Sequence, residues 1–582
     1  MRINLIGNFR TKGLMQDSMI LRGMLAHIYG DKVEIRKVQH AMPDCADAEL
    51  NIFIEVMNTC LLSRAAKNVW IPNPEWVFKT WTPYLSMVDE IWVKTREAEE
   101  LFGLGNVKYI GWTSLDKARA EKKNYSKAIM LVGKNMYRNP KQTLKAYLHI
   151  MQTDSELYKS LPELYIPYNS EHVEFHIPPE LNGKIVILNK ELTDEEYNAL
   201  LEECGLAICT SACEGFGHAV NEAMSSGCNL ILSPIKPFHE LTKEALWLES
   251  LQTIEHPECY GSIVDVTVQS VISMLTKYTK TSFKHKKQVS NNVRLEYEKR
   301  HSEFIELIKP MLEFPIADYS LDSMLPKESE LPDISIVTLT RDRREFMPLA
   351  QYSYMIQSYP EDKLEWVIVD DGDDSIEDTL MGISNVKYIR CNSKMTIGQK
   401  RNLGVQNAMY DILAMVDDDD VYPNNSVLHR AAMMLMKPEK ECVFCTTIPC
   451  YDITKYSSFI NVPPNTLPMS QRVSEATLMF TRKFWQDRNF PDIQVAEGDA
   501  FIHGREHMCR EISPQEVIVS LIHPKNTSSR KIPDIPEPNG CHYGFNEKLF
   551  AVVSEIGETL KVHATEEGLA ALGGAATTTA TA

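Results

Sequence analysis

Residues 412–420 read ILAMVDDDD, an apolar run that passes directly into four consecutive aspartates. Like charges on neighbouring residues repel one another and destabilise a fold unless a cation offsets them. Carboxylate oxygens, together with diphosphate oxygens and water, are ligands that Mg²⁺ and Mn²⁺ prefer. An isolated acidic run is usually a surface turn, but this one leaves an apolar strand, and we therefore predict a divalent-cation site here.

Two apolar runs upstream also end in charged residues. The run ISIVTLT, residues 334–340, leads into Arg341 and Asp342, and the run before residue 370 leads into DDGDD. The segment IGQKRNLG then opens a predicted helix that carries Lys400 and Arg401. Because open α/β sheets bind ligands at the carboxyl ends of their strands, these residues are expected to line one ligand site.

With these motifs in this order, residues 331–545 resemble the GT-A-fold family 2 glycosyltransferases over nearly their full length. The resemblance implies a UDP- or GDP-linked sugar donor, with Asp371 and Asp342 at the base and Arg401 at the nucleotide. It also implies Asp419 as the main metal ligand, and the acidic run leaves a one-residue ambiguity toward Asp418 and Asp420. The donor-binding residues expected in this half are Thr338, Thr340, Arg341, Asp342, Asp370, Asp371, Lys400, Arg401 and Asp417.

Two later segments complete the resemblance. VAEGDAFIHGREH offers Glu497 and Asp499, where the family places the general base of an inverting transfer. The family's acidic pair is adjacent, whereas Gly498 separates the two here. We predict Asp499 as the base and Glu497 as an orienting residue, with helix-capping acids as the alternative. The metal ligands are then Asp419, Asp417 and His523, which resembles the family's late histidine.

The first half contains SACEGFGHAVNEAMSSGCNLILS at residues 211–233. A predicted strand ends near Thr210, a loop with Gly215 and Gly217 follows, and a helix begins near His218. The free N–H groups and the positive end of such a helix suit a diphosphate. Glu214 and Glu222 are about 12 Å apart along the helix, so they can address opposite ends of an elongated ligand.

This segment resembles the E-x7-E signature of GT-B-fold retaining glycosyltransferases of the family 4 type, and the likeness extends over much of residues 1–310. It implies Glu214 near the transferred sugar, as the catalytic residue, and Glu222 on the nucleotide ribose. It also implies that a basic pair replaces a metal at the diphosphate. The other donor-binding residues of this half are Gly7, Gly13, Lys134, Lys141, Gly215 and Gly217.

Two features depart from the family 4 pattern. Lys134 stands where Arg is usual, which keeps the charge and loses the bidentate fork. The histidine of the family's N-terminal domain has no assigned position, because His27 and His40 are candidates by region alone.

The predicted organisation is α/β throughout: a GT-B-type pair of Rossmann-like domains followed by a GT-A-type nucleotide-sugar-binding domain. Ten β-rich runs alternate with helical stretches up to about residue 275, and a long amphipathic helix follows at 286–312. The predicted segments are an acceptor-side domain at 1–120, a donor-side domain at 121–312, a linker at 313–332, the GT-A domain at 333–555 and a low-complexity tail at 556–582.

Bulk composition limits the partners. The net charge of −18 argues against a nucleic-acid surface, and no apolar run is long enough to insert into a membrane. The N-terminus lacks signal-peptide zones, so a cytoplasmic protein is expected. Cys442 and Cys445 form a C-x-x-C, but a second ligand pair at finger spacing is missing, and buried core thiols are preferred to a zinc site.

Together these features favour a bifunctional enzyme of glycan biosynthesis that adds two sugars from nucleotide-sugar donors to a glycan acceptor. The first half would perform a metal-independent retaining transfer, and the second an inverting transfer with Mn²⁺ or Mg²⁺. One alternative is that the first half is a decayed acceptor-binding module. Another is a non-catalytic nucleotide-sugar-binding scaffold of a glycan-assembly complex.

Overall fold

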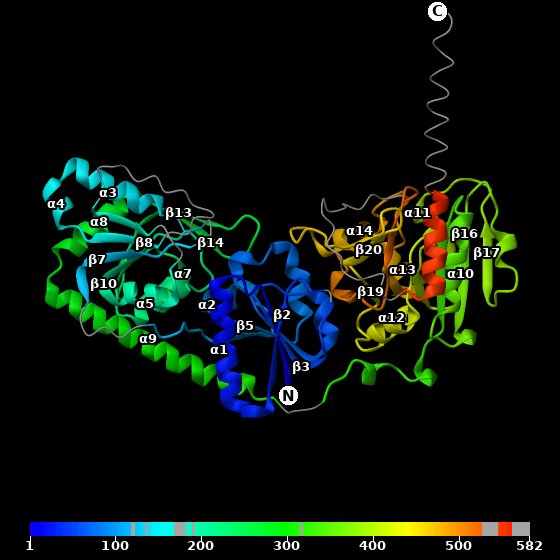
Figure 1. Cartoon of the computed structure of the whole chain (residues 1–582), viewed down its shortest axis with the longest axis horizontal. Coiled ribbons are helices and arrows are strands. Elements are labelled where there is room, and N and C mark those ends of the chain that lie inside the picture. Colours follow the sequence, from blue (N-terminus) through cyan, green and yellow to red (C-terminus); the bar gives the residue numbers. More distant parts are fainter. Residues whose placement is uncertain are drawn as a thin grey trace, which may run out of the picture. The chain divides into compact units, whose positions relative to one another are not determined.

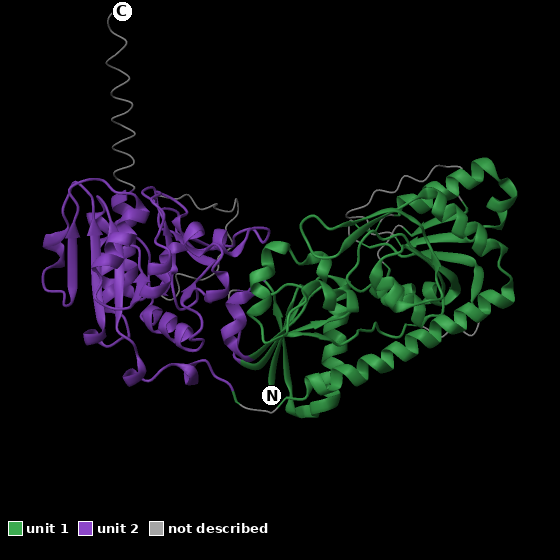
Figure 2. Cartoon of the chain, turned by 180° about the vertical axis from the view of Figure 1, so that it is seen from behind, with its two compact units in different colours: residues 1–40, 48–57, 67–318 green, residues 41–47, 58–66, 319–582 purple. Residues whose placement is uncertain are grey.

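The computed structural model describes residues 1–42, 44–117, 123–133, 137–138, 140–167, 181, 183–188, 192–314, 318–526 and 545–560. The chain forms two compact units, coloured separately in Figure 2. Unit 1 comprises residues 1–40, 48–57 and 67–318. Unit 2 comprises residues 41–47, 58–66 and 319–582.

Unit 1 contains two six-stranded sheets and a small hairpin (Figure 1). The first sheet has the order β2-β1-β3-β4-β5-β6: β1 Arg2–Gly7, β2 Glu34–Gln39, β3 Ala48–Ile54, β4 Ala65–Ile71, β5 Glu90–Val93 and β6 Val107–Tyr109. The second has the order β12-β11-β10-β7-β8-β9: β7 Asn124–Met130, β8 Glu163–Pro167, β9 Ile185–Leu188, β10 Cys204–Cys209, β11 Asn229–Leu232 and β12 Leu246–Trp247. All pairs of the second sheet are parallel. The hairpin joins β13 Ser250–Glu255 to β14 Ser262–Val266.

Helices connect the parallel strands of unit 1: α1 Lys12–Tyr29, α2 Arg96–Phe102, α3 Lys141–Thr153, α4 Ser155–Ser160, α5 Asp194–Glu203, α6 His218–Ser225, α7 Lys236–Leu241, α8 Val268–Lys280 and α9 Phe283–Leu312. The predicted long helix is confirmed as α9. Its buried residues include Val293, Tyr297, Phe304 and Ile308, which recur at helical spacing along one face. The last turn buries Leu312.

Unit 2 is built on a seven-stranded sheet of order β17-β16-β15-β18-β22-β19-β23. Its strands are β15 Ile334–Thr340, β16 Leu364–Asp370, β17 Val386–Arg390, β18 Ile412–Met415, β19 Cys442–Phe444, β22 Met479–Thr481 and β23 Cys509–Glu511. A three-stranded sheet joins β20 Ile448–Asp452, β21 Ser457–Asn461 and β24 Ser520–Ile522. β15, β16, β17 and β18 are parallel, so their carboxyl ends meet at one edge of the sheet. The acidic residues that follow these strands are therefore brought together.

The helices of unit 2 are α10 Met347–Met355, α11 Ile397–Asn407, α12 Ser426–Leu435, α13 Arg482–Asp487 and α14 Glu497–Ile502. A capping box between Thr396 and Gln399 opens α11. A further helix at residues 547–560 packs Val553, Ile556 and Leu560 into a cluster with residues of α10 and β24. The predicted tail boundary at residue 556 therefore falls inside this helix, because an apolar face continues past it.

Every apolar run that was expected to form a strand does so within a few residues. The fold is thus α/β with largely parallel sheets. The cysteines of the C-x-x-C segment, Cys442 and Cys445, are buried, as is Cys450. None of the helices among the described residues combines the length and the apolarity that crossing a bilayer requires.

We expect the helix at 547–560 to be part of the core of unit 2. Ile556→Ala should lower the free energy of unfolding by about 2–4 kcal/mol, because it removes a side chain that is only 4% exposed and leaves a cavity. Urea denaturation followed by circular dichroism measures this change. Glu555→Ala, on the exposed face of the same helix, should change stability by less than about 0.5 kcal/mol. Equal effects of the two substitutions would contradict the core role.

Candidate functional site

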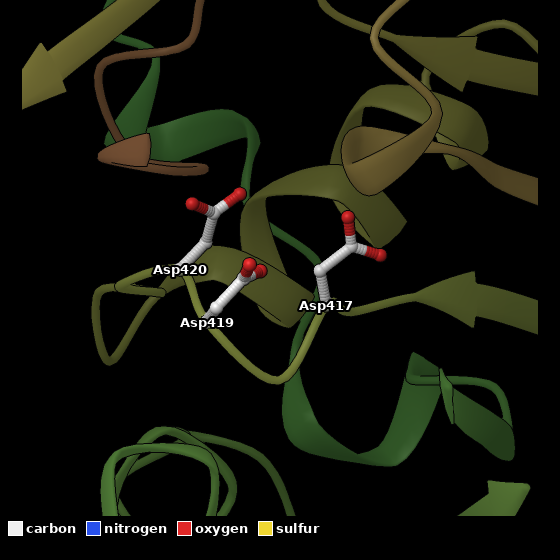
Figure 3. A group of neighbouring side chains, drawn as sticks. All are labelled: Asp417, Asp419 and Asp420. Atoms are coloured by element: carbon white, nitrogen blue, oxygen red, sulfur yellow. The ribbon is translucent and has the colours of Figure 1, made fainter. Parts of the chain in front are cut away.

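The acidic run forms a tight turn immediately after β18. Carboxylate oxygens of Asp417, Asp419 and Asp420 all lie within 4.8 Å of one another. Figure 3 shows the three side chains pointing to the same side of the turn. Among the described residues, this is the one group of His, Cys, Asp and Glu side chains close enough to hold a metal ion. No cysteine belongs to this group.

Two basic side chains contact the turn. Arg343 Nη1 lies 2.8 Å from both Asp418 Oδ1 and Asp419 Oδ2, and His523 Nε2 lies 3.1 Å from Asp419 Oδ2. Burial raises the pKa of Asp419, but Arg343 and His523 outweigh it and hold that pKa below its ordinary value. Asp419 is therefore ionised near neutral pH.

Asp417 and Asp420 have different surroundings. Burial raises the pKa of Asp417 to about 6, against the opposing effect of Arg401. Asp420 accepts hydrogen bonds from Ser520 Oγ and the Leu521 N–H, both 2.8 Å, which tie the turn to β24. The clustered carboxylates of Asp417, Asp419 and Asp420 supply the hard oxygens that Mn²⁺ or Mg²⁺ prefers, whereas the predicted ligand His523 contacts Asp419 but lies outside this group.

The turn forms part of the wall of a pocket of about 770 Å³. Residues from the carboxyl ends of β15 and β18, from the first turns of α11 and from α14 also line it, together with residues of the segment 470–476 and with Ser520, Lys525 and Asn526. The predicted site residues on this wall are Thr340, Arg341, Asp342, Lys400, Arg401, Asp417, Asp419, Glu497 and Asp499. The structure thus brings together residues that the sequence separates by about 160 positions.

Thr338 and Asp370 were expected at the donor but do not line the pocket. Thr338 is fully buried in β15, two residues before the pocket residue Thr340. Its hydroxyl accepts a hydrogen bond from Trp366 Nε1 at 2.8 Å. Asp370 is also fully buried, 2.8 Å from Arg390 Nη1. Both residues therefore support the sheet rather than the pocket surface.

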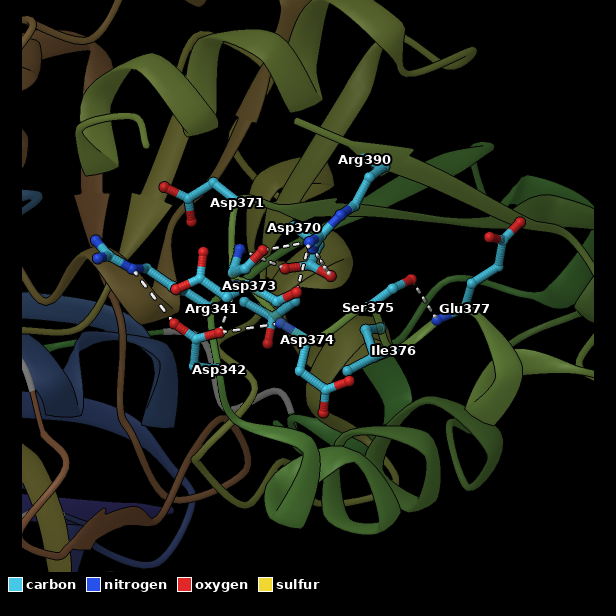
Figure 4. Close-up of polar contacts among 12 residues, drawn as sticks. Arg341, Asp342, Asp370, Asp371, Asp373, Asp374, Ser375, Ile376, Glu377 and Arg390 are labelled. Carbon is cyan, nitrogen blue, oxygen red and sulfur yellow. Dashed lines mark hydrogen bonds and ion pairs between the residues drawn. The ribbon is translucent and has the colours of Figure 1, made fainter. Parts of the chain in front are cut away.

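Asp371 and Asp342 organise the loops around this edge (Figure 4). Asp371 lies behind the pocket wall and pairs with Lys400 Nζ at 2.7 Å, so its effect on a ligand would pass through that lysine. Asp342 has φ 51°, and its carboxylate accepts from the N–H of Asp373 at 2.6 Å. A Cβ at position 372 would lie 2.6 Å from the Asp342 nitrogen, which explains the glycine there.

Arg401 presents a buried cation to the pocket. Its Nε donates to Glu497 Oε1 at 2.8 Å, and its Nη2 lies 3.8 Å from Asp417 Oδ1. Its Nη1 is buried and has no hydrogen-bond partner among the described residues. An unused guanidinium N–H on a pocket wall is suited to an anionic or oxygen-rich ligand.

Sequence reasoning missed several pocket residues, among them Arg343, Ser470 and Glu475. Ser470 Oγ donates to Asp499 Oδ1 at 2.6 Å. Burial and the charge of Glu497 raise the pKa of Glu475 to about 7. Neither Ser470 nor Glu475 belongs to a motif. Arg343 directly follows Asp342. Its position within a charged segment was the one signal in the sequence that could have identified it as a pocket residue.

Glu475 also explains the glycine between the two acids of α14. The Gly498 N–H donates to Glu475 Oε1 at 3.1 Å. A Cβ at position 498 would lie 2.8 Å from that same oxygen. The acidic pair is therefore split by a residue that must leave room for a third carboxylate.

In unit 1, Glu214 and Glu222 have different partners. Glu214 pairs with Arg138 at 2.5 Å and accepts from Ser211 Oγ at 2.9 Å. Glu222 accepts from Gln16 Nε2 at 2.7 Å and lies 3.5 Å from Lys117 Nζ. Each carboxylate is held in a fixed position.

The loop before α6 matches the predicted glycine loop. Gly217 caps the helix with φ 98°, a conformation that L residues rarely adopt. Gly13 faces His218, because a Cβ at position 13 would lie 3.9 Å from the histidine ring. Gly7 lies at the end of β1, where a Cβ would be 3.2 Å from the Ile54 carbonyl oxygen.

His218 belongs to a network that the sequence did not reveal. Its Nε2 lies 2.8 Å from Asp17 Oδ1 and its Nδ1 lies 2.8 Å from Ser114 Oγ. Asp17 also pairs with Lys94 Nζ at 2.6 Å. Burial raises the pKa of Asp17, but Lys94 and His218 outweigh it and keep the pKa well below its usual range.

The predicted basic pair is only partly visible. Lys141 begins α3 with an exposed side chain. Lys134 lies outside the described residues. His27 and His40 were the candidates for the histidine of the family's N-terminal domain. His27 lies in the last turn of α1, and His40 follows β2.

Glu75 adds a buried carboxyl beside the glycine loop. It is 5% exposed, and its Oε2 is buried without a hydrogen-bond partner among the described residues. A Cβ at position 215 would clash with this oxygen, so Gly215 leaves the space that Glu75 uses. Burial, followed by the charge of Glu214, raises the pKa of Glu75 to about 8. The carboxyl is therefore protonated at neutral pH.

This pKa predicts a pH-dependent stability. Between the ordinary value of 4.5 and about 8, the unfolded chain releases the Glu75 proton while the folded chain keeps it, so the contribution to stability falls as pH rises through this range. Glu75→Gln should melt near the wild-type temperature at pH 4.5 and several degrees above it at pH 8. Differential scanning calorimetry measures the two differences. Glu306→Gln, on the exposed face of α9, is the control, and a pH-independent effect of Glu75→Gln would contradict the raised pKa.

Comparison with solved structures gives only weak likenesses. S. aureus TarS 1-349 is 17% identical, with 32% of this chain and 60% of that chain covered and a TM-score of 0.26. Mannosyltransferase PcManGT from Pyrobaculum calidifontis, in complex with GDP-Man and Mn²⁺, is 15% identical, with 38% and 63% covered and a TM-score of 0.28. The chain thus spans less than two thirds of the length of either structure. At these scores the likenesses establish neither a shared activity nor a shared substrate.

The sequence itself matches one family model. No curated protein matches the chain. Residues 335–490 match the model of Glycosyl transferase family 2. The matched range contains nearly all of β15, the acidic turn and the first turns of α11, which line the pocket, whereas α14 lies beyond it. The second half of the chain therefore contains a glycosyltransferase domain.

Proposed function

We propose that the chain is a bifunctional glycosyltransferase that adds two sugars from nucleotide-sugar donors to a growing glycan. The observation that carries the proposal is the acidic turn Asp417–Asp420 on the wall of a pocket within the matched range. The proposed division assigns residues 1–120 and 121–312 to a GT-B pair and residues 333–555 to a GT-A domain. Unit boundaries near residue 318 support this division.

In the second half, Asp417, Asp419 and His523 are the proposed ligands of Mn²⁺ or Mg²⁺. When bound, such an ion neutralises the charge that develops on a departing nucleoside diphosphate. Arg401 and Lys400 approach the same pocket from α11 and would contact the nucleotide. The aspartates alone would repel a diphosphate, so the cation is required to hold it.

Asp499 is the proposed general base of an inverting transfer. It lies on the pocket wall in the first turn of α14, and the hydroxyl of Ser470 fixes one of its oxygens. The other oxygen is then oriented to accept the proton of an acceptor hydroxyl as that hydroxyl attacks the anomeric carbon. Glu497 is committed to Arg401, which favours a positioning role for it.

In the first half we propose a retaining transfer without a metal. The loop with Gly215 and Gly217 opens α6, and Glu214 and Glu222 flank it in fixed positions. Within the described part of unit 1, the carboxylates of this region are balanced by Arg138, Lys94 and Lys117. Permanent cations of this kind can stabilise a leaving diphosphate without a bridging ion.

Chelation distinguishes the two proposed activities. With the full chain and a panel of UDP- and GDP-sugars, EDTA should abolish the second-half transfer and spare the first, and Mn²⁺ should restore what was lost. Asp419→Asn should reduce the second activity by at least about a hundredfold, because it removes a metal ligand. Asp411→Asn, a 92% exposed carboxylate before β18, is the matched control.

Four outcomes would contradict parts of the proposal. Survival of both transfers after exhaustive chelation would exclude the metal-bridge role of the acidic turn. Loss of both would exclude a metal-independent first site. Absence of any transfer by the first half would favour the acceptor-binding module in its place, and absence of transfer by either half would favour the scaffold.

The two carboxylates of the first site should respond differently to substitution. Glu222→Ala should weaken nucleoside diphosphate binding, by about tenfold for the loss of one charge-assisted hydrogen bond, because Glu222 is the proposed ribose ligand. Glu214→Ala should mainly lower the turnover rate. Isothermal titration with UDP and GDP, together with initial rates, separates the two effects. Small and equal effects of both substitutions would support a structural role for the pair.

A further inference from the structure

Among the described residues, Arg343 is the cation closest to the acidic turn. It follows β15 and lines the pocket, with 16% of its side chain exposed. Its Nη1 lies 2.8 Å from Asp418 Oδ1 and from Asp419 Oδ2, and its Nη2 donates to the Lys525 carbonyl oxygen at 2.8 Å. The guanidinium therefore bridges two carboxylates and one backbone oxygen.

The other arginines of this loop make different contacts. Arg344 pairs with Asp374 at 2.7 Å and with Asp378 at 2.9 Å, in an exposed cluster that does not touch the acidic turn. Arg341 lies 3.8 Å from Asp342. The contact with the turn is thus particular to Arg343 among these three residues.

The key atom is Asp419 Oδ2. Besides Arg343, it is contacted by His523 Nε2 at 3.1 Å and by Asn526 Nδ2 at 3.4 Å. Asp419 and His523 are also two of the proposed metal ligands. A divalent ion and the Arg343 guanidinium would compete for the same oxygen, and their like charges would repel at this separation.

We propose that Arg343 is a resident counterion that gives up Asp419 to the divalent ion and then pairs with the diphosphate of the donor. The inference rests on the proposed metal-dependent function of the second half. Arg343 already lies on the wall of the donor pocket, and a planar guanidinium suits phosphate oxygens. The displaced guanidinium would therefore have phosphate oxygens of the bound donor nearby to accept its hydrogen bonds.

This exchange couples metal binding to donor binding. Without donor, the ion must take Asp419 from Arg343 while the guanidinium stays against Asp418, so repulsion between the two cations lowers the affinity for metal. With donor, the diphosphate accepts the displaced guanidinium and the affinity for metal rises. By linkage, the ion must raise donor affinity by the same factor.

The test uses Mn²⁺ alone and Mn²⁺ with UDP or GDP on the full chain, with free Mn²⁺ measured by electron paramagnetic resonance. Without nucleotide, Arg343→Met should bind Mn²⁺ at least about tenfold more tightly than wild type, because the competing charge is gone. The enhancement of Mn²⁺ affinity by nucleotide should be correspondingly smaller in this variant. Arg343→Lys, which keeps the charge, should stay near wild type.

Two controls keep the result interpretable. Arg344→Met removes a neighbouring arginine that does not touch the turn, and it should leave Mn²⁺ affinity unchanged. Because Asp418 is buried against Arg343, Arg343→Met is also compared in an Asp418→Asn background, where no carboxylate is left unpaired. Circular dichroism confirms that each variant is folded.

Equal Mn²⁺ affinity of folded Arg343→Met and wild type would overturn the counterion role alone. Tighter Mn²⁺ binding with unchanged nucleotide enhancement would overturn the diphosphate contact. Binding of Mn²⁺ to the variant but not to wild type would support the counterion. Failure of both proteins to bind Mn²⁺, with or without nucleotide, would overturn the proposed metal-dependent function together with the inference.

Discussion

Repulsion among the four aspartates after β18 is the constraint that the rest of unit 2 accommodates. Each carboxylate has its own compensation: Asp417 faces Arg401, Asp418 faces Arg343, Asp419 faces Arg343 and His523, and Asp420 is held by Ser520 and a backbone N–H. These partners come from the loop after β15, from α11, and from β24 and the segment after it. The ends of these elements must converge for the turn to be stable, and the pocket is the result of that convergence.

Sequence reasoning located this edge because buried strands and charged turns alternate sharply along the chain. It placed β15, β16 and β18 within a few residues, and their parallel pairing brings Thr340, Asp342 and Asp417 to one edge. The sequence does not show how close to the end of a strand a residue must lie to reach the pocket. Thr338 was therefore expected at the pocket surface, although it lies two residues before Thr340 and is fully buried. Nor could sequence reasoning find Glu475 or Ser470, whose positions depend on tertiary packing and leave no periodic pattern.

Unit 1 handles charge differently. Glu214, Glu222 and Asp17 each pair with a permanent donor. Glu75 remains protonated and therefore carries no charge that needs a partner. The Asp17–His218 contact joins positions 201 residues apart, which is why His218 was predicted only as the start of a helix. The glycine loop was predictable from its residue types, whereas the network that supports it was not.

The glycine between Glu497 and Asp499 has a consequence for how this domain varies. Position 498 lacks a side chain because Glu475 fills the space that a Cβ would need. The two positions form one steric unit although 23 residues separate them. Among homologous sequences, positions 475 and 498 are therefore expected to covary: a residue larger than glycine at 498 should accompany a shorter side chain at 475, and a library designed at position 498 alone would be depleted of folded members.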